Sequence, residues 1–82
     1  MKKYDLNNFI ERKVGDKILI IDILQNAIYE VDESAALCID LIKKKEGEID
    51  YIFLSKNMGK NIETLKIEVP MLLSVLLGGE CE

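Results

Sequence analysis

The sequence predicts a single small α+β domain in which three strands come first and three helices follow. Short apolar runs separated by turn signals fill the N-terminal part of the chain, whereas the rest carries apolar residues at helical spacing. The 82 residues are 49% hydrophobic and 32% charged and include one proline, a composition typical of a folded globular protein. This length lies near the lower limit for one core without disulfides or metal, so a second domain is not expected.

The three strands are expected to form an antiparallel meander. Residues 9–14 alternate weakly, and Gly15-Asp16 supplies a turn before the strand over 17–24. Apolar side chains of this second strand fall on both faces of the sheet, so we expect it to lie centrally and to be shielded on both sides. Asn26 tolerates the left-handed conformation of a tight hairpin, and the chain returns as an edge strand over 27–31.

The three helices are expected over 33–45, 48–58 and 62–77. Asp32 is a suitable N-cap for the first helix, and Gly59 fits the left-handed position after the second. Asn61 can cap the third helix. The first helix shows one buried stripe, formed by Leu37, Cys38, Leu41 and Ile42. In the second helix, the side chains expected to reach the core are Ile49, Ile52 and Phe53.

The third predicted helix has more apolar side chains than one buried face requires. Four follow a 4-3-4 spacing, namely Leu65, Val69, Leu72 and Leu76. Others widen the apolar surface, namely Ile62, Ile67, Met71, Leu73, Val75 and Leu77. Because a surface helix needs only about a third of its circumference apolar, we expect a second subunit or a ligand peptide to cover another face. Pro70 either kinks this helix or starts it afresh.

The composition disfavours nucleic-acid binding and catalysis. The 11 basic and 15 acidic residues give a net charge of −4, which repels phosphate. With no histidine and only Cys38 and Cys81, the chain cannot assemble a histidine-dependent nucleophile or a Cys/His zinc site. The paired carboxylates of Asp32-Glu33 are explained by helix capping. We therefore expect no enzymatic activity, no cofactor and no metal.

No signal peptide or membrane-spanning run is recognisable. The N-terminal residues lack an apolar core, and the longest uncharged run, Val69 to Gly79, is too short to cross a bilayer. We expect a cytoplasmic protein.

Two stretches of the chain resemble the PqqD-like family. In the first, Val14-Gly-Asp-Lys-Ile-Leu-Ile-Ile-Asp22, a strand follows a Gly-Asp turn and ends in aspartate. The second, Asn26-Ala-Ile-Tyr-Glu-Val-Asp-Glu-Ser-Ala-Ala36, leads from a turn through a strand into a small-residue helix start, which continues as Ile39-Asp-Leu-Ile42. The likeness covers residues 9–77, and we expect residues 1–8 to be a flexible N-terminal segment and residues 78–82 a C-terminal tail.

The resemblance implies a winged-helix-like domain that acts as a RiPP precursor peptide recognition element. Such a peptide chaperone is not catalytic: it binds the leader of a ribosomally synthesised precursor peptide and presents it to a modifying enzyme. The modifying enzymes that the resemblance implies include radical SAM maturases, a leader peptidase and cyclodehydratases. The leader is expected to pair with the edge of the third strand, against the third helix. The implied peptide-binding residues are Ala27, Ile28, Tyr29, Glu30, Val31, Leu65, Lys66, Val69 and Leu72.

Other interpretations of the same residues stay open. Core packing accounts for Tyr29 and the aliphatic members of this set, and a solvated helix surface accounts for Lys66. A homodimerisation module would expose the same self-complementary apolar surface. A winged-helix DNA-binding regulator needs a recognition helix rich in basic and amide side chains, whereas residues 62–77 contain only Lys66 of these types.

Overall fold

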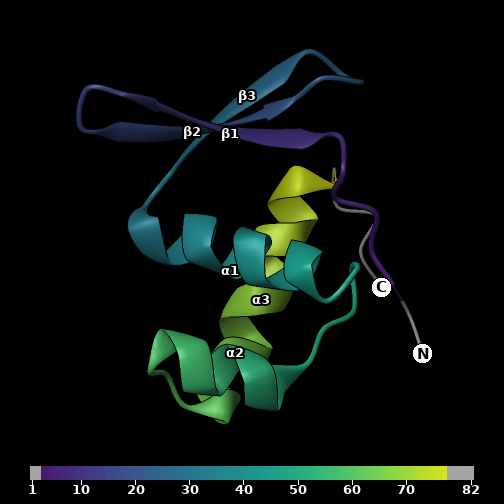
Figure 1. Ribbon diagram of the computed structural model, residues 1–82, viewed down its shortest axis with the longest axis vertical. Coiled ribbons are helices and arrows are strands. Elements are labelled where there is room, and N and C mark those ends of the chain that lie inside the picture. Colours follow the sequence, from purple (N-terminus) through teal and green to yellow (C-terminus); the bar gives the residue numbers. More distant parts are fainter. Residues whose placement is uncertain (1–2, 78–82) are drawn as a thin grey trace. The chain divides into compact units, whose positions relative to one another are not determined.

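The computed structural model of the chain describes residues 3–77. Its elements are the strands β1 (Phe9–Val14), β2 (Lys17–Asp22) and β3 (Ala27–Val31), followed by the helices α1 (Glu33–Lys44), α2 (Tyr51–Met58) and α3 (Ile62–Leu76) (Figure 1). The predicted α+β class, a three-stranded antiparallel sheet followed by three helices, is confirmed. The chain divides into two compact units, residues 1–49 and residues 50–82, and each is described by itself.

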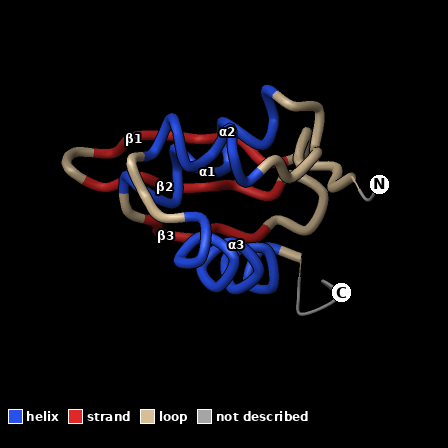
Figure 2. Tube along the Cα trace, turned by 90° about the horizontal axis from the view of Figure 1, so that it is seen from below, coloured by secondary structure: helices blue, strands red, loops and turns tan. Residues whose placement is uncertain are grey.

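The sheet in the first unit is a meander with β2 in the middle, as predicted (Figure 2). Gly15 and Asp16 form the two-residue connection between β1 and β2. The φ angle of Gly15 is +65°, and a positive φ at the first central residue is what a hairpin turn of this length needs. The connection from β2 to β3 ends on Asn26, whose φ of 57° confirms the predicted left-handed residue.

Asp22 ends β2, as the resemblance implies and two residues before the end that the apolar run predicted. Its Oδ1 atom accepts hydrogen bonds from the backbone N–H groups of Leu24 (3.0 Å) and Gln25 (3.2 Å) and from Nδ2 of Asn8 (2.9 Å). These bonds turn the chain, so Ile23 and Leu24 lie in the loop and their side chains are exposed. Burial raises the pKa of the Asp22 carboxyl, but the three hydrogen bonds outweigh that effect and the pKa lies below its ordinary value.

Helix α1 covers one face of the sheet, where it contacts β2 and β3 (Figure 1). On β2, the alternate side chains of Ile18, Ile20 and Asp22 are buried. Leu19 and Ile21 fall on the opposite face because side chains alternate along a strand, and they are half-buried. The expected shielding of β2 on both faces is therefore complete on one face only.

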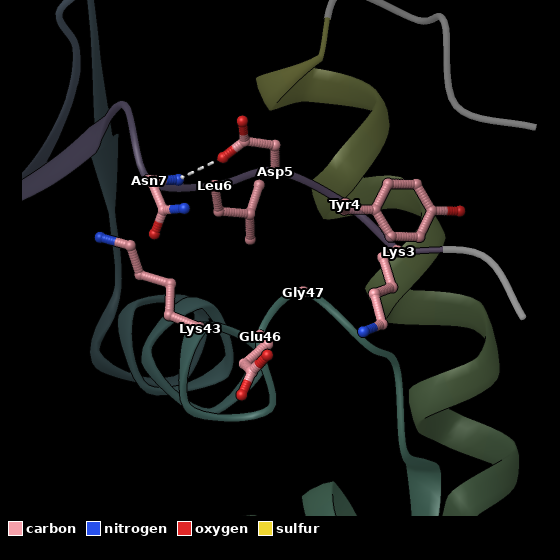
Figure 3. Close-up of a pocket in the computed structure, with 8 residues that line it drawn as sticks. All are labelled: Lys3, Tyr4, Asp5, Leu6, Asn7, Lys43, Glu46 and Gly47. Carbon is pink, nitrogen blue, oxygen red and sulfur yellow. Dashed lines mark hydrogen bonds between the residues drawn. The ribbon is translucent and has the colours of Figure 1, made fainter.

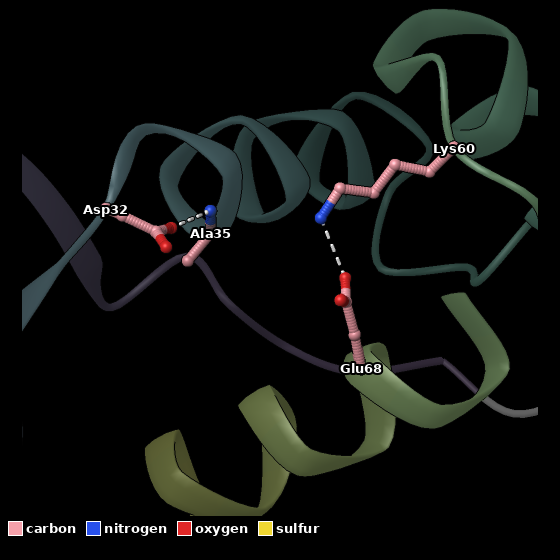
Figure 4. A network of polar contacts seen from close by, with 4 residues as sticks. All are labelled: Asp32, Ala35, Lys60 and Glu68. Carbon is pink, nitrogen blue, oxygen red and sulfur yellow. Dashed lines mark hydrogen bonds and ion pairs between the residues drawn. The ribbon is translucent and has the colours of Figure 1, made fainter. Parts of the chain in front are cut away.

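Helix α1 begins where the sequence predicted. The Oδ1 atom of the N-cap Asp32 accepts a hydrogen bond from the backbone N–H of Ala35 at 2.8 Å (Figure 4). Leu37, predicted to be buried, is instead 40% exposed, because the buried face lies toward Ala36 and Ile39 and leaves Leu37 at its margin. The buried side chains of the helix are Ala36, Cys38, Ile39, Leu41 and Ile42.

Residues 3–8, for which the polar sequence predicts a flexible segment, make defined contacts with the turn after α1. Lys3 forms a β-bridge with Glu48, and the N–H of Tyr4 donates to the C=O of Gly47 at 2.8 Å. Leu6 is only 2% exposed. The pocket beside this segment is lined by Lys3, Tyr4, Asp5, Leu6, Asn7, Lys43, Glu46 and Gly47 (Figure 3). The predictions for residues 1–2, for the tail 78–82 and for Cys81 lie outside the described residues.

The second unit pairs α2 with α3. Helix α2 begins at Tyr51 and not at residue 48, because Asp50 is its N-cap and accepts a hydrogen bond from the N–H of Phe53 at 3.1 Å. Leu54 is its buried side chain, whereas Ile52, predicted to reach the core, is exposed. Gly59 ends the helix with a φ of 68°, which confirms the predicted left-handed residue.

Helix α3 runs as one helix from Ile62 to Leu76, so it does not start afresh at Pro70. Asn61 occupies the N-cap position but makes no capping hydrogen bond with its side chain. Lys60 Nζ and Glu68 Oε1 form an ion pair at 2.8 Å near the start of the helix (Figure 4). No helix within residues 3–77 combines the length and the apolar character needed to cross a membrane.

Candidate functional site

The candidate site is the outer edge of β3, and the register of the two hairpins determines which of its backbone groups point outward. Val14 and Lys17 close a two-residue hairpin, so they exchange both backbone hydrogen bonds. Bonded and non-bonded pairs then alternate along β1 and β2. The N–H of Ile23, which donates to the C=O of Asn8 at 3.0 Å, continues this alternation beyond the strand ends.

The same alternation assigns the backbone groups of β3. The odd-numbered residues of β2 bond to β1, and its even-numbered residues therefore bond to β3. Their partners in β3 are Ala27, Tyr29 and Val31. The N–H and C=O groups of Ile28 and Glu30 consequently point away from β2, toward the open edge of the sheet.

The outward backbone groups of Ile28 and Glu30 are unpaired within the described chain. Among residues 3–77, the ladder to β2 is the only set of backbone hydrogen bonds that reaches β3. The two residues present two donors and two acceptors at alternate positions, which is the pattern that another strand can pair with. The edge of β3 is therefore competent to receive an extended chain.

The other edge of the sheet, β1, differs from β3 in two ways. The first β1 residue whose backbone groups point away from β2 is Phe9, and both groups already have partners. Its N–H donates to the C=O of Leu6 at 3.1 Å, and its C=O accepts from Lys43 Nζ at 2.5 Å. The next outward residues are Glu11 and Lys13, whose charged side chains lie on the face that α1 covers. Inward-facing charges on an edge strand deter further pairing, so β3 is the more open edge.

The side chains of β3 divide between the two faces of the sheet. Those of Ala27, Tyr29 and Val31 lie on the face covered by α1 and are half-buried. Those of Ile28 and Glu30 lie on the opposite face and are exposed. Core packing thus accounts for three of the five predicted strand residues, and Ile28 and Glu30 are the two available on the surface.

The four predicted residues of α3 differ in exposure. Leu65 and Val69 are buried, and Leu72 is half-buried. Lys66 is exposed, with Nζ 5.9 Å from the centroid of the Tyr51 ring, which is the geometry of a cation–π contact. The structure thus brings the five strand residues together in the first unit and the four helical residues together in α3 of the second unit.

Sequence reasoning did not separate the exposed apolar side chains of α3 from the buried ones. The exposed set, at a constant spacing of four, is Ile67, Met71 and Val75. The buried set is Leu65, Val69, Leu73 and Leu76. The predicted surplus of apolar surface on this helix is present, but the buried set repeats at nearly the same spacing, so periodicity alone does not identify the exposed stripe.

The part of the chain that the structure describes forms no metal centre. Among residues 3–77, no cluster of three or more histidine, cysteine, aspartate or glutamate side chains is placed to hold a metal ion. The buried Asp22 carboxylate is occupied by hydrogen bonds from Asn8, Leu24 and Gln25, so it serves the loop before β3.

Comparisons with known proteins find no match to this chain among protein-family models, curated proteins or solved structures. The resemblance to the PqqD-like family therefore depends on the sequence stretches around the Gly15-Asp16 turn and β3.

Proposed function

We propose that the protein is a non-catalytic peptide-binding module that accepts an extended segment of a partner peptide as a fourth strand beside β3. The observation that carries this proposal is the unpaired edge at Ile28 and Glu30. The resemblance to the PqqD-like family supports a more specific role, in which the peptide is the leader of a ribosomally synthesised precursor. The module would then present this leader to a modifying enzyme in the cytoplasm.

The expected affinity is moderate. The four outward backbone groups can form two to four hydrogen bonds, each contributing about 1 kcal/mol net. We expect the peptide to bury two or three apolar side chains, each of which adds about 1.5 to 3 kcal/mol. Ordering a disordered peptide costs several kcal/mol. The balance corresponds to a dissociation constant of about 1 μM. Backbone pairing alone reads no sequence, so specificity has to come from side chains.

A second copy of the chain is the alternative occupant of the edge, and the side chains of β3 disfavour it. In an antiparallel pair of two β3 edges, a residue whose backbone groups point away from β2 must lie opposite another such residue, that is, Ile28 or Glu30. Full overlap places each Ile28 opposite Glu30 of the other copy. Pairing Ile28 with itself overlaps only residues 27–29, and pairing Glu30 with itself sets two carboxylates opposite each other, which is destabilising. No register is both long and complementary.

A DNA-binding function has less support. Lys66 is the one basic residue of α3, and its ammonium group lies over the Tyr51 ring. A helix of this composition has few groups that could read bases or contact phosphates.

Hydrogen exchange at single amides tests the proposal directly. The probes are synthetic peptides that cover the short reading frames encoded beside the gene, titrated into the isotope-labelled full chain. Without peptide, the amides of Tyr29 and Val31 should exchange slowly because they donate to β2, and those of Ile28 and Glu30 should exchange fast. A bound peptide should slow Ile28 and Glu30 and leave the other two unchanged. Binding that leaves Ile28 and Glu30 unprotected contradicts strand addition.

Proline substitution at the edge provides a variant with a matched control. The N–H of Glu30 points away from β2, so Glu30→Pro removes an edge donor and keeps the ladder intact, as proline does on natural edge strands. Glu30→Thr removes the same carboxylate but keeps the donor. We expect Glu30→Pro to fold and to lose at least about tenfold in peptide affinity. Glu30→Thr should bind the peptide more tightly than Glu30→Pro does, because it loses only the carboxylate. Equal affinities for the two variants would show that the edge is not the binding site.

Sedimentation at micromolar concentration separates the peptide-binding module from the dimerisation module. A monomer that binds peptide supports the proposal, whereas a dimer whose sedimentation does not change when peptide is added supports self-association.

A further inference from the structure

The sheet face opposite α1 carries two rows of side chains that run across the strands and end at the open edge. Direct opposition in both hairpins defines the first row as Ile10, Ile21 and Ile28 and the second as Arg12, Leu19 and Glu30. Ile28 is 64% exposed and Ile10 is 39% exposed, so the first row is an aliphatic strip open to solvent. The second row ends in a carboxylate.

A strand added beside β3 would extend both rows by one side chain. Ile28 and Glu30 are two residues apart and share a face, so the two peptide residues opposite them are also two apart and lie on that same face. Every pair in this sheet is antiparallel, the arrangement that is more stable per residue. In that direction, the peptide residue opposite Glu30 comes two positions before the one opposite Ile28.

Glu30 is available to a new partner. Its carboxylate lies 4.0 Å from Lys17 Nζ, and both side chains are more than half exposed, so this ion pair contributes little. A basic side chain directly opposite Glu30 would be closer than the diagonal Lys17. An aliphatic side chain opposite Ile28 would cover part of the exposed strip.

We infer that the outer face of the sheet selects peptides in which a lysine or arginine precedes an aliphatic residue by two positions. The inference depends on the proposed strand addition to β3 and specifies which peptides that edge takes. Backbone pairing fixes the register, the aliphatic side chain continues the isoleucine row, and the cation neutralises Glu30.

Three short threonine-rich peptides of equal length test this selection by titration of the labelled full chain. The first has lysine two positions before isoleucine, the second has the two residues exchanged, and the third has glutamate in place of lysine. We expect the first to bind about three- to tenfold tighter than the second and about tenfold tighter than the third. In each titration, slowed exchange at the Ile28 and Glu30 amides reports whether the peptide is paired with β3.

Three variants assign the preference to individual side chains. Glu30→Lys should reverse the preference, so that the glutamate peptide binds tighter than the lysine peptide. Ile28→Thr keeps a β-branched residue and should lose the preference for isoleucine but keep the preference for lysine. Lys17→Gln removes the competing cation and should raise the affinity for the lysine peptide. The amide spectrum of each variant shows whether it is folded.

The outcomes separate the selection from strand addition itself. Equal affinities for the three peptides, with the Ile28 and Glu30 amides protected, would overturn the selection and leave strand addition standing. A preference that Glu30→Lys does not reverse would overturn it as well. If no peptide protects those amides, both the selection and the proposed function fail.

Discussion

Replacing Gly47 with alanine tests whether residues 3–8 are a structural part of the first unit. Gly47 has a φ of +89°, and a Cβ atom built on it would lie 2.1 Å from the carbonyl oxygen of Tyr4 and 3.0 Å from the carbonyl carbon. Both of these are backbone atoms, so no side-chain rotation can relieve the clash. The N-terminal segment has to move away from the turn after α1.

The expected loss of stability combines three effects. Alanine in a left-handed conformation costs about 1 to 2 kcal/mol. The hydrogen bond from the N–H of Tyr4 to the C=O of Gly47 contributes about 0.5 to 1.5 kcal/mol, and displacement of the segment also exposes Leu6, at about 1.5 to 3 kcal/mol. We expect Gly47→Ala to lower the free energy of unfolding by about 3 to 6 kcal/mol, which is a large part of the total for a domain of this size.

Urea unfolding followed by circular dichroism measures this loss, and Gly15→Ala is the matched control. Gly15 also has a positive φ, +65°, but nothing lies within 4 Å of the position of its Cβ. The control therefore includes only the backbone cost of about 1 to 2 kcal/mol. We expect the two variants to differ by at least about 2 kcal/mol. Losses that agree within the error of the measurement would refute the packing described for residues 3–8.

Three further predictions concern single side chains. The pKa of Asp22 is lower in the folded chain than its ordinary value of 3.8, so the ionised carboxylate stabilises the fold above that pH and this stability is lost as the pH falls through the lower, folded pKa. In acid titrations followed by circular dichroism, Asp22→Asn should lose stability less steeply below pH 3.8 than the natural chain, and equal slopes would argue against this assignment. Pro70→Ala restores a helical N–H at an exposed position of α3 and should raise the free energy of unfolding by about 1 to 3 kcal/mol in urea titrations; no gain would mean that the native helix already compensates for proline. Asp32→Ala removes the bond to the N–H of Ala35 and should cost about 1 kcal/mol in the same assay, whereas Asp32→Asn, which can still cap, should cost less.

The candidate site was predictable from the sequence only in part. The strand over 27–31 and its place at the edge followed from the apolar run and from Asn26, and both are confirmed. The outward direction of the backbone at Ile28 and Glu30 depends on the register of both hairpins, which the turn geometry determines. In α3, apolar residues surround most of the helix, so periodicity could not tell the buried Leu65 and Val69 from the exposed Ile67.

The sequence by itself determined the turns and helix caps, which depend only on neighbouring residues. Asn26 and Gly59 adopt the left-handed conformation expected of them, Gly15 lies in the predicted turn, and Asp32 caps α1 as predicted. These outcomes agree because turn and cap preferences depend on backbone geometry within a few residues. Contacts between distant parts of the chain were decided by the tertiary structure alone.

Leu6 is the clearest case of such a contact. It belongs to a polar stretch, yet it is buried in the unit where Tyr4 bonds to Gly47. Asp22 ends β2 early in part because Asn8, 14 residues away, donates to its carboxylate. A local sequence pattern cannot identify a hydrogen-bond partner so far along the chain, and it cannot show that Leu6 is buried.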